Sequence, residues 1–323
     1  MEELKFLYTT DKKYFPHMLT SIYSLLENNK NHNIEIYIIE DGFQMNEFEY
    51  LLKLEKLYKN LEIKVYLAED LKMIMEEYNI PKWRDTTIAN ARLFASELIN
   101  YDKILYLDSD TIIAQPLDEL FSMPMQHPIA AAKNLTVPLH TRKKLSVYYN
   151  SGVIMFDSAA WKKEKCLEKL KQTIDTNKIK LLYPDQDLIN LAFKDQIDTL
   201  TTDYNLHPIY YQYLDHNILL QKFFRRKEVL FDYNEIKQAI ENPHIYHSLC
   251  YLQLRPWEEN QIHPFNKIYE KYRKMWDPTF KPEDNEKMIS NYLFVSYLNL
   301  LSKAYLPENI HKILSNKVKK IKK

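Results

Sequence analysis

Asp108 and Asp110, two carboxylates one residue apart, are the residues of this sequence best placed to do chemistry. They follow the apolar run Lys103-Ile104-Leu105-Tyr106-Leu107, which predicts a short strand buried in a sheet. Open α/β sheets bind ligands at the carboxyl edge, where both carboxylates would emerge. Paired carboxylates repel each other unless a cation lies between them, and oxygen ligands suit Mg²⁺ or Mn²⁺. The spacing therefore predicts a metal site, with a solvated turn as the alternative.

The composition indicates a globular protein without a charge-driven partner. The 323 residues suffice for one large α/β domain or two smaller ones, and a hydrophobic content of 46% is ordinary for a folded core. Lys and Arg together number 44, as do Asp and Glu, so no overall field attracts nucleic acid. We therefore expect no nucleic-acid partner.

The cysteines and the two ends of the sequence predict its location. Cys166 and Cys250 offer neither a disulfide framework nor a thiolate metal cluster, which fits a reducing cytoplasm. The acidic start has no secretory character, and no stretch reaches about 18 consecutive apolar residues. Residues 310–323 place apolar side chains on one helical side and lysines on the rest. This pattern predicts a cytoplasmic protein with a peripheral contact at the inner face of the membrane; a solvated terminus is the alternative.

Glycine is scarce, and this scarcity limits how a nucleotide can be bound. Gly42 and Gly152 are the two glycines, so neither a dinucleotide fingerprint nor a Walker phosphate loop is present. A metal ion could neutralise a diphosphate without a glycine-rich loop. Gly152, beside an Asn and a Ser, is predicted to mark a position where a side chain would collide with ligand or backbone, with a β-bulge as the alternative.

The order of the expected elements predicts an α/β fold. Strands and helices alternate from the start of the chain, which implies a parallel sheet with helices on both faces. Strands are expected over residues 4–9, 34–39, 61–67, 103–107, 129–132 and 245–247, and helices over 17–28, 47–57, 86–100, 161–176, 264–276 and 286–301, with another ending near Phe193.

Four further residues have a functional interpretation and an ordinary one. Asp11 falls at the carboxyl end of the first strand, where it binds ligand or caps the following helix. Arg92 points either into a metal-diphosphate site or into a surface ion pair. Asp185 either lines a site or caps the helix that follows it. His247 ends a short strand, and a lone histidine is more often a satisfied core or surface residue than a ligand.

The segments from about Leu4 to Trp257 resemble family 8 retaining glycosyltransferases, the group that contains bacterial lipooligosaccharide galactosyltransferases and glycogenin. The order and spacing of several landmarks together carry this resemblance. The landmarks are Thr9-Thr10-Asp11 with Tyr14, Ala91-Arg92, Leu105-Tyr106-Leu107-Asp108-Ser109-Asp110, Tyr149-Asn150-Ser151-Gly152, Asp185-Gln186-Asp187, Tyr204-Asn205, and His247 with Arg255-Pro256-Trp257.

The resemblance implies a fold, a donor and a set of site residues. The fold is GT-A, a nucleotide-sugar transferase fold with a mostly parallel Rossmann-like sheet, over residues 1–260, followed by a C-terminal helical extension over 261–323 with the basic tail. Asp108, Asp110 and His247 would hold Mn²⁺ or Mg²⁺ against the diphosphate of a UDP-sugar. The donor would contact Thr9, Thr10, Asp11, Tyr14, Ser109, Asn150, Ser151, Gly152 and Arg255. Arg92, Asp185 and Gln186 would surround the sugar as catalytic residues, with Gln186 near the anomeric carbon.

The activity implied is transfer of a hexose, glucose or galactose, from a UDP-sugar to a glycan, glycolipid or glycoprotein acceptor with retention of configuration. Because the amide of Gln186 is a poor nucleophile, we favour attack on the face that the diphosphate leaves over a double displacement. The sequence departs from the family pattern at three positions. Cys250 stands in place of a glycine in a slightly longer loop, Arg255 replaces a lysine, and Asn134 stands where galactosyltransferases have an aspartate. Galactose is therefore not favoured over glucose.

Three alternative classes of protein share parts of this pattern. A phosphatase of the haloacid dehalogenase type also begins with a strand and Asp-x-Asp, but it needs a downstream Gly-Asp pair, and Gly152 is followed by Val153. A calcium loop starting at Asp108 is excluded, because Ile112 and Ile113 occupy the positions of a ligand and of the turn glycine. A non-catalytic UDP-sugar-binding or interaction protein would use the same residues as the enzyme and remains an alternative.

Overall fold

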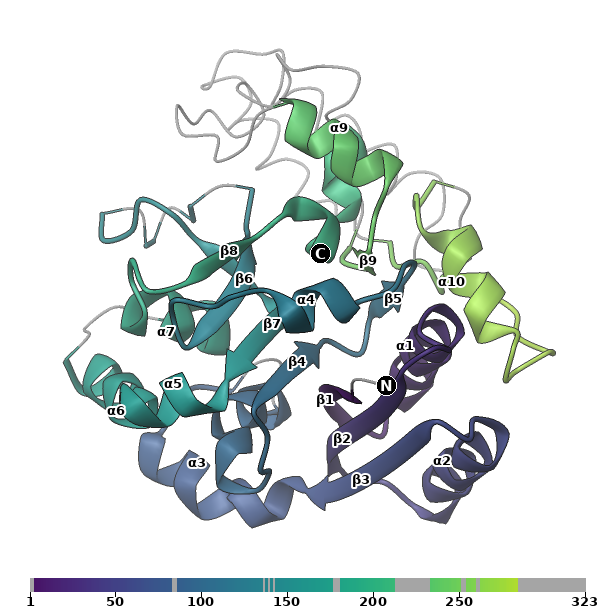
Figure 1. The fold of residues 1–323 in the computed structure, drawn as a ribbon, viewed down its shortest axis with the longest axis horizontal. Helices are drawn as coiled ribbons and strands as arrows, with labels where there is room; N and C mark the ends of the chain where they lie inside the picture. The colour runs from purple at the N-terminus through teal and green to yellow at the C-terminus, as the bar shows by residue number, and fades with distance from the viewer. Residues whose placement is uncertain are drawn as a thin grey trace, which may run out of the picture.

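The computed structural model describes residues 3–82, 86–135, 137–138, 140–141, 143–176, 181–212, 233–250, 254–259 and 262–283. A seven-stranded sheet in the order β3-β2-β1-β4-β7-β6-β8 runs through it (Figure 1). Its strands are β1 (Glu3–Asp11), β2 (Asn33–Asp41), β3 (Leu61–Leu67), β4 (Lys103–Leu107), β6 (Ile129–Lys133), β7 (Tyr149–Asp157) and β8 (Asp198–Leu200). Strand β7 is antiparallel to both neighbours, and the other pairings are parallel. The expected mostly parallel sheet is confirmed.

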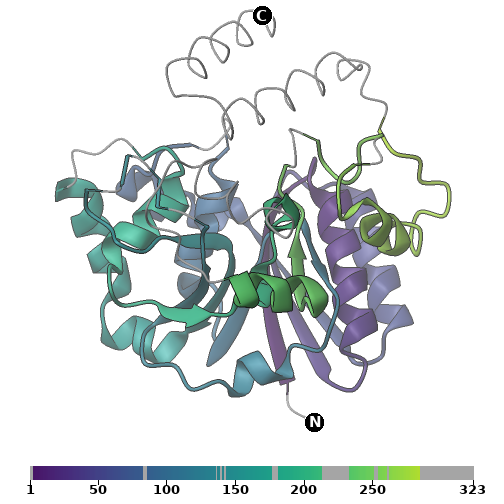
Figure 2. The same cartoon turned by 90° about the horizontal axis from the view of Figure 1, so that it is seen from above.

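Helices cover both faces of this sheet (Figure 2). One face carries α1 (Phe15–Asn28) and α2 (Met45–Leu57). The other carries α3 (Lys72–Tyr78), η2 (Ile88–Glu97), α5 (Ser158–Lys163), α6 (Cys166–Thr176) and α7 (Pro184–Ala192). The remaining elements are η1 (Ala68–Leu71), β5 (Thr111–Ile113), α4 (Asp118–Ser122), η3 (Thr202–Asn205), η4 (Pro208–Gln212), α9 (Tyr233–Glu241), β9 (Ile245–His247) and α10 (Asn266–Arg273).

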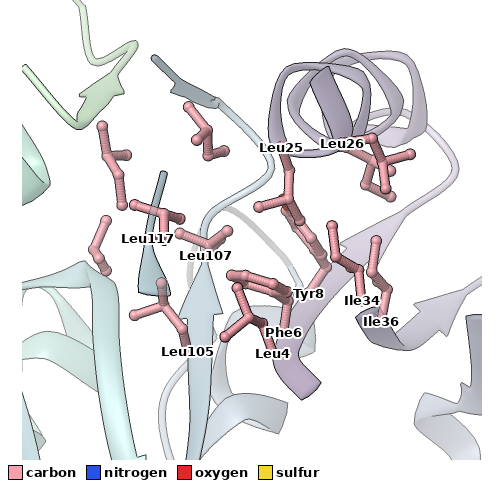
Figure 3. Packing of buried hydrophobic residues seen from close by; sticks show 14 of the residues in the cluster. Leu4, Phe6, Tyr8, Leu25, Leu26, Ile34, Ile36, Leu105, Leu107 and Leu117 are labelled. Atoms are coloured by element: carbon pink, nitrogen blue, oxygen red, sulfur yellow. The ribbon is translucent and has the colours of Figure 1, made fainter. Parts of the chain in front are cut away.

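The core is divided by the alternation of side chains along the strands. Leu4, Phe6 and Tyr8 of β1 pack toward α1, where Leu25 and Leu26 meet them (Figure 3), whereas Leu7 belongs to the cluster on the opposite face. Successive side chains of a strand point to opposite faces, so a continuous apolar run serves two layers. Full burial of each such side chain contributes about 1.5–3 kcal/mol, which fixes the strand register and hence the positions of the strand ends.

Two expected helices differ in the structure. Residues 161–176 form two helices, because Lys165 takes a left-handed conformation with φ of 52° between α5 and α6. The expected helix over 86–100 is instead the 3₁₀ helix η2. There Arg92 Nε donates to the carbonyl of Ala89 at 2.7 Å, so a backbone oxygen in the first turn of the helix accepts a hydrogen bond from a side chain.

A second, two-stranded sheet pairs β5 with β9 in antiparallel register. Helix α10, at the start of the expected C-terminal extension, packs on α1, where Tyr269 hydroxyl and His17 Nδ1 lie 2.7 Å apart. The basic tail over 310–323 and the expected helix over 286–301 lie outside the described residues. Within the described part of the chain, no helix combines the length and the apolar character needed to span a bilayer.

Candidate active site

A cavity of about 740 Å³ opens at the carboxyl ends of β1 and β4. Parallel strands end at the same edge of a sheet, so polar residues that follow them meet there. With the exception of Gly152, all residues predicted to bind metal or donor, or to act at the sugar, line this cavity. They come from the ends of β1, β4 and β9, the start of β7, the 3₁₀ helix η2, the first turn of α7 and the loop at Arg255.

Asp108, Asp110 and His247 converge on one point. Strand β5 follows Asp110 directly and pairs with β9, so that Thr111 lies opposite His247. His247 Nε2 lies 3.5 Å from Asp108 Oδ2 and 3.2 Å from Asp110 Oδ1, and one ligand atom from each of the three residues lies within 4.8 Å of the others. The predicted ligand set is therefore brought together by a strand pairing between distant segments.

Gly152 makes room for this cluster. A Cβ atom at this position would lie 2.2 Å from His247 Cε1 and 2.7 Å from Asp108 Oδ2. The pairing of β6 with β7 is also irregular between Ala131 and Lys133, opposite the stretch that contains Gly152. The structure thus contains both features predicted for Gly152, a side-chain collision and a strand irregularity. The collision is with two of the predicted metal ligands.

The two aspartates and the histidine hold opposite charges in a buried place. Burial acts to raise the pKa of Asp108, but Arg92 and His247 outweigh it and leave the pKa below its ordinary value. The pKa of Asp110 is lowered in the same way by His247 and Arg255. Burial alone would lower the pKa of His247, but the two carboxylates raise it to about 9. A divalent cation held by these three residues would take the place of the imidazolium proton.

Arg92 points into the cavity and does not form a surface ion pair. Its side chain is 5% exposed and lies 4.1 Å from the centre of the Tyr106 ring. The guanidinium contacts Asp108 Oδ1 at 3.0 Å and Asp185 Oδ2 at 3.5 Å, and it donates to the carbonyl of Ser151 at 2.6 Å. A planar guanidinium can make several such contacts at once, so Arg92 joins Asp108 to the first turn of α7.

Arg255 lies on the other side of the aspartate pair. Its guanidinium donates to Asp110 Oδ2 and to the carbonyl of Ser248, each at 2.6 Å. Two guanidinium groups therefore flank the carboxylates, one on each aspartate.

The residues predicted to surround the sugar form a connected group. Gln186 Oε1 accepts hydrogen bonds from Asn150 Nδ2 at 3.0 Å and from the backbone N–H of Ser151 at 3.1 Å. Asp185 does not cap α7, which begins after Tyr183 without a side-chain cap; instead its carboxylate faces Arg92. Asp187, fully buried, accepts the backbone N–H groups at the start of this helix.

Asp11 is the last residue of β1. Its Oδ1 accepts the backbone N–H of Tyr14 at 2.8 Å, just before α1, so the carboxylate orders this turn while it lines the cavity. Thr9 Oγ1 lies 3.3 Å from the hydroxyl of Tyr106, and the Thr10 hydroxyl donates to the carbonyl of Asp11. The residues predicted to hold the nucleotide thus form one wall.

The family comparison agrees with this geometry. The family model of glycosyl transferase family 8 matches residues 5–260. The chain belongs to this family. The fold that the sequence predicted, GT-A, is also the fold of solved glycosyltransferase structures. An active-site mutant of LgtC superposes with a TM-score of 0.66 at 16% identity, over 84% of this chain and 96% of that one. The glycosyltransferase GlyE of Streptococcus pneumoniae gives 0.62 at 21% identity, over 86% and 62%.

Two curated relatives of this family 8 chain are bacterial glycosyltransferases. The lipopolysaccharide 1,2-glucosyltransferase of Escherichia coli K12 is 26% identical over 286 residues, which cover 83% of each chain. Glycosyltransferase GlyA of Streptococcus pneumoniae is also 26% identical, over 206 residues that cover 64% of this chain and 28% of GlyA. The chain therefore spans less than a third of the length of that relative.

The family 8 site contains one residue whose role sequence reasoning missed. Tyr106 donates from its hydroxyl to Asp108 Oδ1 at 2.6 Å, and its ring lies beneath the Arg92 guanidinium. Burial, helped by the charge of Asp108, outweighs the opposing charge of Arg92 and holds the pKa of Tyr106 well above its ordinary value, so the hydroxyl remains a donor. A signal was available, because residues two apart in a strand share a face and Tyr106 precedes Asp108 by two.

Proposed function

We propose that this chain is a metal-dependent retaining glycosyltransferase that moves glucose or galactose from a UDP-sugar to a glycan, glycolipid or glycoprotein. One observation carries the proposal: Asp108, Asp110 and His247, from distant segments, bring their ligand atoms together at the wall of a cavity large enough for a nucleotide-sugar. Family membership favours transfer over the phosphatase alternative.

The residues fit a hard divalent cation such as Mn²⁺ or Mg²⁺. Two carboxylates and an imidazole supply oxygen and nitrogen ligands, and His247 Nε2 is buried without a hydrogen-bond partner among the described atoms. Asp108, Asp110 and His247 would hold the ion. When bound, it would act as a Lewis acid for the departing diphosphate.

The charge of the cavity supports the same proposal. Among the described residues that line it, the carboxylates of Asp11, Asp108, Asp110 and Asp185 outnumber the three permanent cations of Lys13, Arg92 and Arg255 by one. The imidazolium of His247, whose pKa is raised to about 9, balances this difference, so the metal-free cavity carries no net positive charge that would attract an anionic UDP-sugar. A divalent cation in place of the imidazolium proton would make the net charge positive, and donor binding would then depend on the metal.

The environment of Gln186 supports attack on the face that the diphosphate leaves. Its carbonyl oxygen already accepts two hydrogen bonds, so its lone pairs are engaged away from an anomeric carbon. In this mechanism a leaving phosphate oxygen takes the proton of the acceptor hydroxyl, while the nearby carboxylate of Asp185 stabilises the positive sugar ring. A glycosyl adduct trapped on Asp185 or Asp187 would overturn it and indicate a double displacement.

The hexose of the donor is proposed as either glucose or galactose. The relatives and solved structures similar to this chain include a lipopolysaccharide glucosyltransferase and a galactosyltransferase, LgtC. Asn134 lines the cavity with a side-chain amide, which can donate to or accept from a sugar hydroxyl of either configuration. We therefore keep both hexoses. A cytoplasmic location, with the tail over 310–323 at the membrane, remains a prediction.

The test is a panel of UDP-sugars with Mn²⁺, read by release of UDP, for the wild type and for Asp110→Asn. We expect turnover with UDP-glucose or UDP-galactose and a loss of about 100-fold or more in the variant, because a Lewis acid contributes several kcal/mol. Asp175→Asn, on the exposed side of α6, is the matched control. Unchanged turnover in Asp110→Asn would count against the metal role. Donor binding without UDP release would favour the non-catalytic alternative.

A further inference from the structure

Asn205 joins the metal end of the site to the sugar end without reaching the cavity. It lies at the end of η3 with 1% of its surface exposed. Its Oδ1 lies 2.9 Å from His247 Nδ1, and its Nδ2 donates to Asn150 Oδ1 at 2.9 Å. Since Asn205 is not among the residues that line the cavity, it can act on a substrate only through its neighbours.

The direction of these hydrogen bonds is fixed by one backbone group. The N–H of Gly152 can only donate, and it points at Asn150 Oδ1 at 2.9 Å, so this atom of Asn150 is the oxygen. An oxygen requires a donor from Asn205, which places Nδ2 there and turns Oδ1 toward His247. His247 Nδ1 must then carry a hydrogen, because Oδ1 can only accept.

We propose that Asn205 is a positioning residue that fixes His247 with Nδ1 protonated and Nε2 directed at Asp108 and Asp110 as a metal ligand. Metal-bound histidines generally donate their other ring N–H to such a partner, which sets the tautomer and the orientation of the ring. The inference rests on the proposed metal site. It adds the residue that prepares the ligand, and this residue belongs to neither the ligand set nor the donor pocket.

The same chain of amides continues to the sugar end. Asn150, whose oxygen is engaged, turns its Nδ2 toward Gln186 Oε1, which also accepts the N–H of Ser151. The orientation of the Gln186 amide and the tautomer of His247 are therefore set by one set of hydrogen bonds. Loss of Asn205 is expected to reach His247 directly and Gln186 through Asn150.

The test is a double-mutant cycle on Mn²⁺ affinity, measured by titration calorimetry on the full chain without any sugar. Asn205→Leu is expected to raise the Kd for Mn²⁺ about 10- to 100-fold. In a His247→Ala background the same substitution is expected to raise it no further, because its path to the metal is gone. Asn29→Leu, which removes an equally buried amide with two hydrogen bonds far from the site, is expected to leave the Kd unchanged.

A conservative variant keeps the test valid if Asn205→Leu does not fold. Asn205→Asp loses the donor to Asn150 Oδ1 but retains an oxygen that accepts the hydrogen of His247 Nδ1, so its Kd for Mn²⁺ is expected to stay within about 10-fold of the wild type. A rise of more than about 10-fold in the Kd of Asn205→Asp, wild-type affinity in Asn205→Leu, or equal losses from Asn205→Leu in both backgrounds would each overturn the proposal.

Sugar transfer is measured separately, so the two proposals can fail independently. A wild type that binds Mn²⁺ with the expected dependence on Asn205 but releases no UDP would overturn the proposed function alone. A wild type that transfers sugar with Mn²⁺ affinity indifferent to Asn205 would overturn the positioning role alone.

Discussion

Replacement of Gly152 by alanine tests whether space for the metal ligands is the reason for this glycine. The added Cβ would lie 2.2 Å from His247 Cε1, whereas carbon atoms pack at about 3.5–4.0 Å, so the ring must retreat by about 1.3 Å. A displacement of about 1 Å at a reacting site can cost about 100-fold in rate. We expect Gly152→Ala to lower Mn²⁺ affinity and UDP release by about this factor.

The stability of this variant should change little. The atoms that collide belong to the ends of two side chains, which can turn aside at a cost of about 0.5–1.5 kcal/mol for an off-rotamer conformation. The other glycine supplies the control. Gly42 has φ of 84°, and a Cβ added there would meet no atom within 4 Å, so Gly42→Ala costs about 1–2 kcal/mol of backbone strain without touching the site.

Calorimetric titration with Mn²⁺, UDP release and thermal unfolding of both variants give the comparison. Similar small losses of stability are expected from both, with loss of metal affinity confined to Gly152→Ala. Wild-type affinity in Gly152→Ala would refute the steric reasoning. A loss of affinity in Gly42→Ala would show that metal binding follows general stability instead of local space.

Two further predictions concern stability. Arg92→Gln is expected to lower the free energy of unfolding by about 3 kcal/mol, because it removes one partner of a buried ion pair and leaves Asp108 without its guanidinium. Urea unfolding measures this loss, and an unchanged midpoint would contradict the pairing. Burial lowers the pKa of His17 to about 3 and that of His263 to about 4, so the unfolded chain binds more protons than the folded chain below the ordinary value of 6.5. Burial also holds the pKa of His207 well below its ordinary value, so the stability of the metal-free chain should fall by about 3–4 kcal/mol from about pH 6 to about pH 5. His247, with its raised pKa, contributes fully throughout, and equal urea midpoints at the two pH values would contradict the prediction.

The carboxylate pair could be predicted from sequence because its causes are local. An apolar run of strand length fixes β4, and the rule that ligands bind at the carboxyl edge places Asp108 and Asp110 at a site. The same reasoning placed Asp11 after β1, and the parallel pairing of β1 with β4 brings these strand ends together. Strand periodicity and edge geometry need no knowledge of distant contacts.

Other features depend on contacts that no local pattern encodes. The three-residue strand β5 is too short to show a period, yet its pairing with β9 brings His247 to Asp110. The sequence alone also left Arg92 divided between surface and interior, because a helical arginine has the same pattern in both cases. Its inward position is set by contacts with Asp108, Ser151 and the ring of Tyr106, which lie outside η2.

The antiparallel direction of β7 explains why Ser151 and Gly152, near its start, lie beside Asp108, which follows the end of β4. Strand β7 is antiparallel to β4, with Val153 opposite Leu107, so β7 begins at the edge where β4 ends. Its first residues therefore lie at the site. The carbonyl of Gly152 accepts the N–H of Asp108 at 2.8 Å, and that of Ser151 accepts from Arg92. In a parallel strand the same residues would lie at the opposite edge of the sheet, a strand's length from the aspartates, so the antiparallel direction of β7 is a requirement of the site.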